Sequence, residues 1–385
     1  FDCKLPGKIV QIRTIAVSNG QSNVDRHERF VQSIFKQFTC PIPYHHGLAR
    51  QLHRFCSKIA EKQTISFRRR LPKVKIVKRL KKILVAIDTS LDKNPIVEEA
   101  TEIAHFNQAS LTIVDIVPPF SWLARQSTED HEHLSELIAK EKSEKLAALV
   151  AKASEKVNEV QSKVLKGKAA VEIIREVVHG EHDLVMAVAK GKHSKSDNYF
   201  GHTSMRLLRQ CPSAVWLVAP DSTPKSKHIL GCVDTASTQA LDLELNDKIF
   251  EISQSISKYH NTRFSILHTW FMDDESMLST RLSSQQILEY EQEERKHHEE
   301  RLDKFLGQYN LACDSGNVHL VKGQTEEAIA EFIDANAVDL LVMGTVARKG
   351  LGGFFFGNTA EKILEHVECS VLALKPYGFK SSIKA

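Results

Sequence analysis

Several features that would place this 385-residue chain in a specialised class are missing from its sequence. No run approaches the roughly 18 apolar residues of a transmembrane helix. The seven cysteines are scattered, with no CxxC pair and no cysteine–histidine cluster at the spacing of metal ligands, which argues against a disulfide scaffold and a zinc-finger site. No HExxH, no nucleophile elbow and no catalytic triad can be placed. We therefore expect a reduced, cytosolic protein that is not an enzyme.

Methionine is also scarce, and its positions bear on the basic first segment. The chain begins with Phe1, and its first methionine is Met186. Residues 1–79 hold 17 Lys and Arg against four Asp and Glu, whereas the other 306 residues hold 35 against 44. We expect residues 1–79 to be a disordered extension or an artefact of the gene model, with an arm for nucleic acid or an anionic surface as the alternative. The acidic remainder argues against a large nucleic-acid-binding face.

From residue 80 onward, short apolar runs alternate with amphipathic helical patterns. The apolar run at 83–87 fits a strand that is buried on both faces of a parallel sheet. The expected strands are 83–87, 111–114, 184–188 and 214–218, with another before Gly167, and the expected helices are 96–104, 132–163, 169–178 and 203–210. This alternation predicts a doubly wound α/β layer.

The same pattern occurs a second time in the chain. Residues 229–235 match residues 83–89, and Asp234 follows Asp88 at a separation of 146. The separation rises to 156 further along, as loop insertions between retained strands would produce. The sequence therefore predicts two copies of one module, at 80–220 and 226–377, followed by a tail at 378–385.

A glycine-rich loop lies near the end of the second copy. It begins at Gly344 after an apolar run, and a helix is expected to start just after Gly357. Glycines let backbone N–H groups approach an anion, and the N-terminus of a helix adds partial positive charge. Arg348 and Lys349 would add side-chain charge. The pattern indicates phosphate binding, although it is neither a P-loop nor a Rossmann fingerprint.

These residues resemble the universal stress protein family, and the two copies resemble its tandem members. The similarity lies in the spacing Gly344-x2-Ala347-x9-Gly357-Asn358, the opening Val233-Asp234 and the closing 369–372, and it covers residues 80–377. It implies two modules, each a Rossmann-like parallel sheet of about five strands flanked by helices. It also implies that the glycine loop holds a triphosphate and that the aspartate after the first strand contacts the nucleoside.

The resemblance implies an ATP site in the second module, formed by Asp234, Thr269, Gly344, Ala347, Gly357 and Asn358. Asp234 would face the nucleoside, Thr269 would lie beside the base, and the others would line the phosphates. Ala347 stands where the family has a glycine, and Asn358 stands where it has a serine or threonine. In the first copy Val188 takes the place of Gly344, so we expect that module to be a structural partner, with a weaker anion site as the alternative.

Other polar residues are expected to have structural roles. Asp88 is expected to cap a turn or helix, whereas capping and nucleoside contact both stay open for Asp234. His268, at the end of a strand, is expected to be structural. His297 and His298 lie among charged residues and are expected to be solvated surface, and no second set of ligands near them indicates a metal.

The terminal strand of each module is short and apolar, so each would expose an edge. Pairing 214–218 with 371–374 would cover both edges and give an intrachain pseudo-dimer. We expect a stress-response protein that binds an adenine nucleotide or a similar anionic small molecule in its second module, with no membrane partner. The alternatives are an interaction module that has lost nucleotide binding and, third, a slow ATPase.

Overall fold

The computed structural model describes residues 2–5, 8–11, 80–91, 94–119, 128–190, 199–220, 226–237, 239–272, 277, 280–348 and 354–384. The chain divides into two units, residues 1–71 and 72–385, and each is considered by itself. In the first unit, β1 (Asp2–Leu5) and β2 (Lys8–Gln11) pair as an antiparallel hairpin. This hairpin lies within the segment predicted to be a disordered extension (1–79), whose other residues up to 79 lie outside the described ones.

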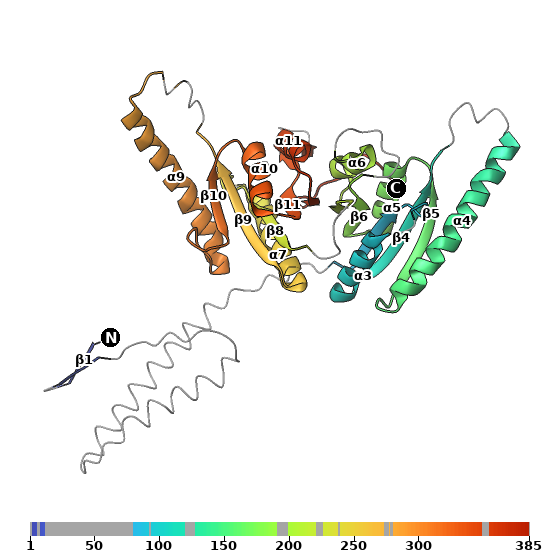
Figure 1. Ribbon diagram of the computed structural model, residues 1–385, viewed down its shortest axis with the longest axis horizontal. Helices are drawn as coiled ribbons and strands as arrows, with labels where there is room; N and C mark the ends of the chain where they lie inside the picture. Colours follow the sequence, from blue (N-terminus) through green and yellow to red (C-terminus); the bar gives the residue numbers. More distant parts are fainter. Residues whose placement is uncertain are drawn as a thin grey trace, which may run out of the picture. The chain divides into compact units, whose positions relative to one another are not determined.

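A ten-stranded sheet organises the second unit, in the order β10-β9-β8-β11-β14-β7-β6-β3-β4-β5 (Figure 1). Its first half in the chain comprises β3 (Lys82–Ile87), β4 (Ser110–Val117), β5 (Val160–Lys166), β6 (Leu184–Val188) and β7 (Ala214–Val218). The second half comprises β8 (His228–Cys232), β9 (Arg263–Trp270), β10 (Val318–Lys322), β11 (Leu340–Gly344) and β14 (Ser370–Leu374). Within each half all pairs are parallel, so the predicted doubly wound fold with two modules is confirmed.

Two layers of helices cover the two faces of this sheet. One layer contains α3 (Pro95–Asn107), α4 (Thr128–Ser154), α7 (Ala240–His260) and α9 (Ser284–Leu306). The other contains α5 (Ala169–Gly180), α6 (His202–Gln210), α10 (Thr325–Asn336) and α11 (Asn358–His366). Alternate residues of β3 enter the two cores, Val85 on one face and Leu84 on the other, as a strand covered on both sides requires. None of the described helices is both long and apolar enough to span a membrane.

The two modules join edge to edge at the centre of the sheet. β14 and β7 pair antiparallel, with Leu372 opposite Trp216 and Val371 opposite Leu217. These side chains are at most 3% exposed, so the junction is part of the core. The pairing predicted for the two terminal strands is confirmed, and it removes the open edge that each module would otherwise have.

One expectation about local structure was wrong. The helix predicted for 132–163 ends at Ser154, whereas the strand expected before Gly167 is present as the outermost strand β5, which begins at Val160. This strand pairs with β4 alone and is only half-buried, so its polar residues look like the surface of a helix in the sequence. After the last strand, Ile383 packs on the core and the Phe379 ring centre lies 5.1 Å from Lys375 Nζ.

Candidate functional site

A cavity of about 850 Å³ opens at the carboxyl ends of β8, β9 and β11 in the second module. This is the edge of a parallel α/β sheet where ligands commonly bind. Five of the six residues predicted for the site line it: Asp234, Thr269, Gly344, Gly357 and Asn358. The sixth, Ala347, lies just beyond Gly344 in the short strand β12 (Val346–Arg348).

Asp234 lies in the turn that follows β8, and its side chain is exposed. Its carboxylate Oδ1 accepts the backbone N–H of Ala236 at 3.0 Å, as an aspartate does in a capped turn. Asn246 of α7 makes two hydrogen bonds with the Asp234 backbone. Its amide nitrogen donates to the Asp234 carbonyl at 2.6 Å, and its side-chain oxygen accepts the Asp234 N–H at 3.0 Å. Asp234 therefore caps a turn and also borders the cavity, and its contact with a nucleoside stays a prediction.

Gly344 ends β11, and its role is to leave space rather than to allow positive φ. A Cβ at this position would lie 2.6 Å from Leu245 Cδ2, which also lines the cavity. Ala347 pairs with Phe355 of β13 (Phe354–Phe356) in an antiparallel hairpin. An extended strand accepts any side chain, so alanine in place of glycine is no obstacle to this backbone.

Gly357 is the N-cap residue of α11, with φ −75° and ψ 136°, and as a glycine it has no side chain to cap the helix. Its own N–H donates to the Thr345 carbonyl at 3.1 Å, which ties the helix start to the end of β11. Asn358 and Thr359 follow at the rim of the cavity. The first backbone N–H groups of a helix are suited to an anion, because they lack partners within the helix.

A pair of histidines lies on the β9 side of the cavity, and the sequence did not reveal it. His268 is 3% exposed, and its Nε2 lies 3.0 Å from Nδ1 of His298 on α9. The His298 ring also stacks on Trp270, with ring centres 5.8 Å apart. The expectation that His298 is solvated surface was therefore wrong, whereas its neighbour His297 is exposed. Burial lowers the pKa of both His268 and His298.

The sequence did not predict the burial of His298, because α9 is rich in charged residues and shows no clear apolar stripe around it. The signal that could have found it is the internal repeat. At the separation of 156 that relates the later parts of the modules, His298 corresponds to Lys142. His268 corresponds in the same way to Asp115, at a separation of 153. An opposite-charge pair in one copy indicates that the two positions touch in both.

In the first module these two positions form a buried ion pair. Lys142 Nζ lies 2.8 Å from Asp115 Oδ2 and 4.0 Å from Asp88 Oδ1. The Thr89 backbone N–H and hydroxyl also donate to Asp115, at 2.9 Å and 2.5 Å. In the second module the corresponding hydroxyl of Thr235 is buried and has no hydrogen-bond partner among the described residues. The first module thus satisfies these polar groups internally, and the second does not.

The charged side chains that line the second-module cavity are mostly acidic. Among the described lining residues, Asp234, Asp242 and Glu294 are carboxylates, and Arg301 is the guanidinium. No group of three potential metal ligands occurs among the described histidines, cysteines and acidic residues. Among the described residues, binding of an anion would therefore depend on backbone N–H groups, Arg301 and the two histidines, whereas Lys349 of the glycine loop lies outside them.

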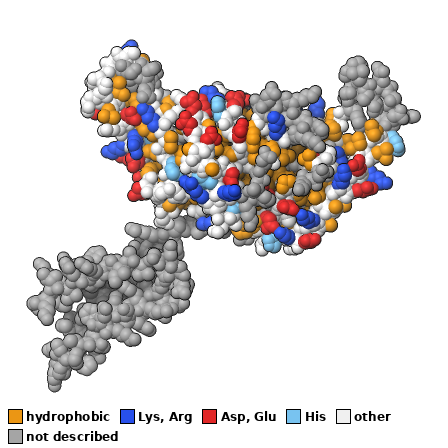
Figure 2. Space-filling model, viewed as in Figure 1, with side chains coloured by type: hydrophobic (Ala, Val, Ile, Leu, Met, Phe, Trp, Pro, Cys, Tyr) orange, Lys and Arg blue, Asp and Glu red, His pale blue; other side chains and the backbone are white. Residues whose placement is uncertain are grey.

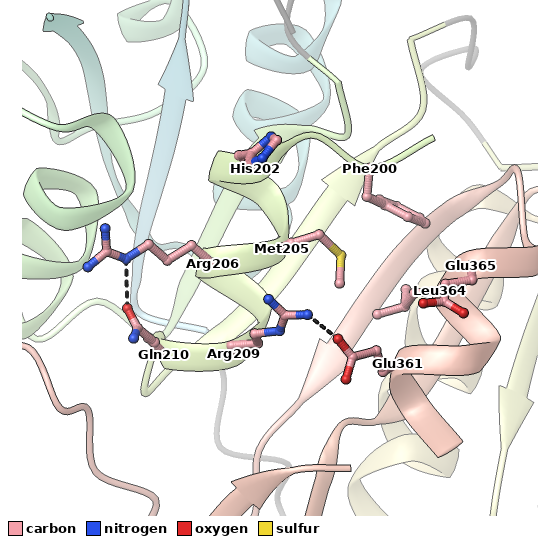
Figure 3. Close-up of a pocket in the computed structure, with 9 residues that line it drawn as sticks. All are labelled: Phe200, His202, Met205, Arg206, Arg209, Gln210, Glu361, Leu364 and Glu365. Atoms are coloured by element: carbon pink, nitrogen blue, oxygen red, sulfur yellow. Dashed lines mark hydrogen bonds and ion pairs between the residues drawn. The ribbon is translucent and has the colours of Figure 1, made fainter. Parts of the chain in front are cut away.

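A second cavity, of about 580 Å³, lies between α6 and α11, where the modules meet (Figure 3). Arg209 reaches across it and pairs with Glu361, and Arg206 donates to Gln210 at 2.8 Å on its own helix. None of the predicted site residues lines it. The Arg209–Glu361 ion pair links the two modules here, whereas the hydrogen bond of Arg206 stays within α6.

On the face shown in Figure 2, acidic and basic side chains of the second unit are interspersed. No band of one sign crosses this face, in contrast to the basic stripe of a nucleic-acid-binding surface.

The profile of the universal stress protein family matches residues 79–219 and again residues 225–375. The chain belongs to the universal stress protein family. The two matches coincide with the two five-stranded halves of the sheet, so this member of the family is a tandem one.

Proteins named universal stress protein E are among the relatives that this chain resembles. Universal stress protein E of Salmonella typhi is 29% identical over 224 residues, which span 55% of this chain and 67% of that protein. Universal stress protein E of Photorhabdus laumondii is 26% identical over 79% of this chain and 97% of its own length. A universal stress protein structure from Pseudomonas aeruginosa covers 77% of this chain and 94% of its own, with a TM-score of 0.56 at 20% identity, and thus shares the fold. The chain is therefore similar to the universal stress protein E type.

Proposed function

We propose that the second module binds an adenine nucleotide, ATP or a similar anionic small molecule, in the cavity beside β8, β9 and β11. The family match supports a stress-response protein. One observation carries the finer proposal: five residues selected from the sequence, between positions 234 and 358, line the same cavity. Asp234 and Thr269 lie on the side of β8 and β9, and Gly357 and Asn358 lie at the uncapped start of α11.

The first module is proposed to be the structural partner. Its ion pair between Lys142 and Asp115 lies where the second module has two cavity-lining histidines. Val188 takes the place of Gly344, where a Cβ would press on Leu245 in the second module. Both differences favour one ligand site for each chain.

Calorimetry of the full chain with ATP tests the proposal, and the repeat supplies a matched control. Gly357→Asp places a carboxylate at the N-cap of α11, where aspartate is a favourable cap, so the fold is retained while an anion is repelled. Gly201→Asp makes the same change at the N-cap of α6, which has a similar extended conformation. We expect Gly357→Asp to weaken ATP binding at least about tenfold, close to 1.4 kcal/mol. We expect Gly201→Asp to leave it unchanged.

The opposite outcomes have distinct meanings. Equal losses of ATP affinity in the two variants would show that the assignment of the site to the second module is wrong. Wild-type protein that binds no ATP at millimolar concentration would favour the second candidate, an interaction module for an uncharged or cationic ligand or a protein. The predominance of carboxylates over Arg301 among the described lining residues is the observation that favours this candidate. Turnover of ATP is a third candidate, and it would have to be abolished by Gly357→Asp.

A further inference from the structure

We propose that His298 is a ligand-binding residue of the second-module cavity, and that its Nε2 atom takes up a proton when an anionic ligand binds. This inference rests on the proposed function and adds a residue that the family motif does not contain. Hydrogen bonds fix which nitrogen of each histidine carries hydrogen.

The direction of the histidine pair is set by a backbone carbonyl. His268 Nδ1 lies 3.0 Å from the Val233 carbonyl oxygen, which can only accept a hydrogen bond. His268 must therefore carry hydrogen on Nδ1, which leaves Nε2 as the acceptor in the neutral ring. His298 Nδ1, at 3.0 Å, must then donate to it. In the neutral pair the bare nitrogen is His298 Nε2, and the next proton has to bind there.

The surroundings of the pair favour the neutral state while the cavity holds no anion. Burial lowers the pKa of His298, and Arg301 lowers it further, while Glu294 and Asp234 act in the opposite direction. Burial also lowers the pKa of His268, and the neighbouring His298 adds to this effect. Among the other described titratable groups, His297 on α9 also acts on His298, and Asp242 of α7 lines the same cavity.

An anionic ligand changes this balance. Its charge would enter a cavity in which the described walls carry three carboxylates and one guanidinium. Added negative charge raises the pKa of a nearby histidine, so the pair gains a proton and becomes cationic. The first module already has a permanent cation at this place, the Lys142 ammonium, but Asp115 neutralises it. The second module has an inducible cation and no carboxylate partner at the equivalent of Asp115.

The sign of the pH dependence follows from this linkage. The bound state holds more protons than the free state, so affinity rises as the pH falls between the bound-state and free-state pKa values of the pair. For one proton the rise is at most about tenfold per pH unit. Acid below the free-state pKa gives no further gain, because both states are then protonated.

The experiment is calorimetry of ATP binding to the full chain in two buffers of different ionisation enthalpy, between about pH 6 and about pH 8. ATP itself titrates in this range, so the informative quantity is the difference between wild type and variants. We expect His298→Asn to bind ATP about tenfold more weakly at the acid end and to take up fewer protons than wild type. His297→Asn, at the exposed neighbour on the same helix, should match wild type.

A double variant guards against a simple folding defect. His268→Asp with His298→Lys installs the pair of the first module, which the same fold already accommodates. It should fold, bind ATP more weakly and lose the proton uptake. Binding of ATP to His298→Asn with wild-type affinity and proton uptake would overturn the assignment of His298 while leaving the proposed nucleotide site intact. Absence of ATP binding to wild type at every pH would instead overturn the nucleotide site, and this inference with it.

Discussion

Lys142→Met is the sharpest test of how the first module fills its own site. Methionine keeps most of the apolar stem and removes the ammonium that lies 2.8 Å from Asp115 Oδ2. The Asp115 side chain is only 3% exposed, so its charge would remain in the core without a cation. Loss of one partner of a buried pair costs about 3 kcal/mol at the low end of its range. The low end applies because Thr89 and the Ile116 N–H still donate to Asp115.

Urea denaturation measures this loss of stability, and the same helix offers a control. Lys145 lies almost one turn further along, pairs with Glu141 at 2.7 Å, and has a side chain that is 48% exposed. Lys145→Met should leave the urea midpoint nearly unchanged, because exposed ion pairs contribute little. The reasoning is refuted if Lys142→Met is no less stable than Lys145→Met. Asp115→Asn combined with Lys142→Met should recover part of the loss, because no buried charge remains.

Three further predictions concern single positions. Gly344→Ala should push Leu245 into the cavity and weaken ATP binding several-fold by calorimetry, whereas Gly316→Ala, which meets no atom within 4 Å, should not. Burial raises the pKa of the Glu99 carboxyl group from 4.5 to about 8. Ionisation above about pH 4.5 therefore favours the unfolded state, and the folded protein loses stability as the pH rises toward about 8. Glu99→Gln should therefore be more stable than wild type, by up to about 1.4 kcal/mol for each pH unit up to about pH 8, in urea titrations. Asn358→Ser should strengthen ATP binding by about 1 kcal/mol if a hydroxyl there donates to phosphate, and equal affinity by calorimetry would count against that contact.

Much of the fold could be predicted because the strands are short apolar runs and the pattern occurs twice. The start of α11 after Gly357 and the pairing of 214–218 with the last strand followed from the same reasoning. The strand before Gly167 was expected, but the helix ahead of it was extended over the first residues of β5, because a half-buried edge strand keeps polar residues. The hairpin of β12 and β13 was read only as a glycine loop, since Gly and Phe in succession do not indicate pairing.

The candidate site was predictable only where a family motif covers it. The motif selected residues that line the cavity, but it does not include the residues on the opposite wall. His298 was missed because the burial of a histidine on a charged helix depends on which turn meets the sheet, and the residues of α9 alone do not show this. In the first module, the ion pair of Asp115 and Lys142 shows that the positions corresponding to His268 and His298 are in contact.

The stoichiometry of ATP binding to the full chain tests the central claim most directly. Titration calorimetry on protein that has been freed of bound nucleotide gives the number of sites for each chain. The account predicts one, in the second module, because the first module fills the equivalent place with its own ion pair. Two sites would contradict the assignment of the first module as a structural partner, and no site would contradict nucleotide binding altogether.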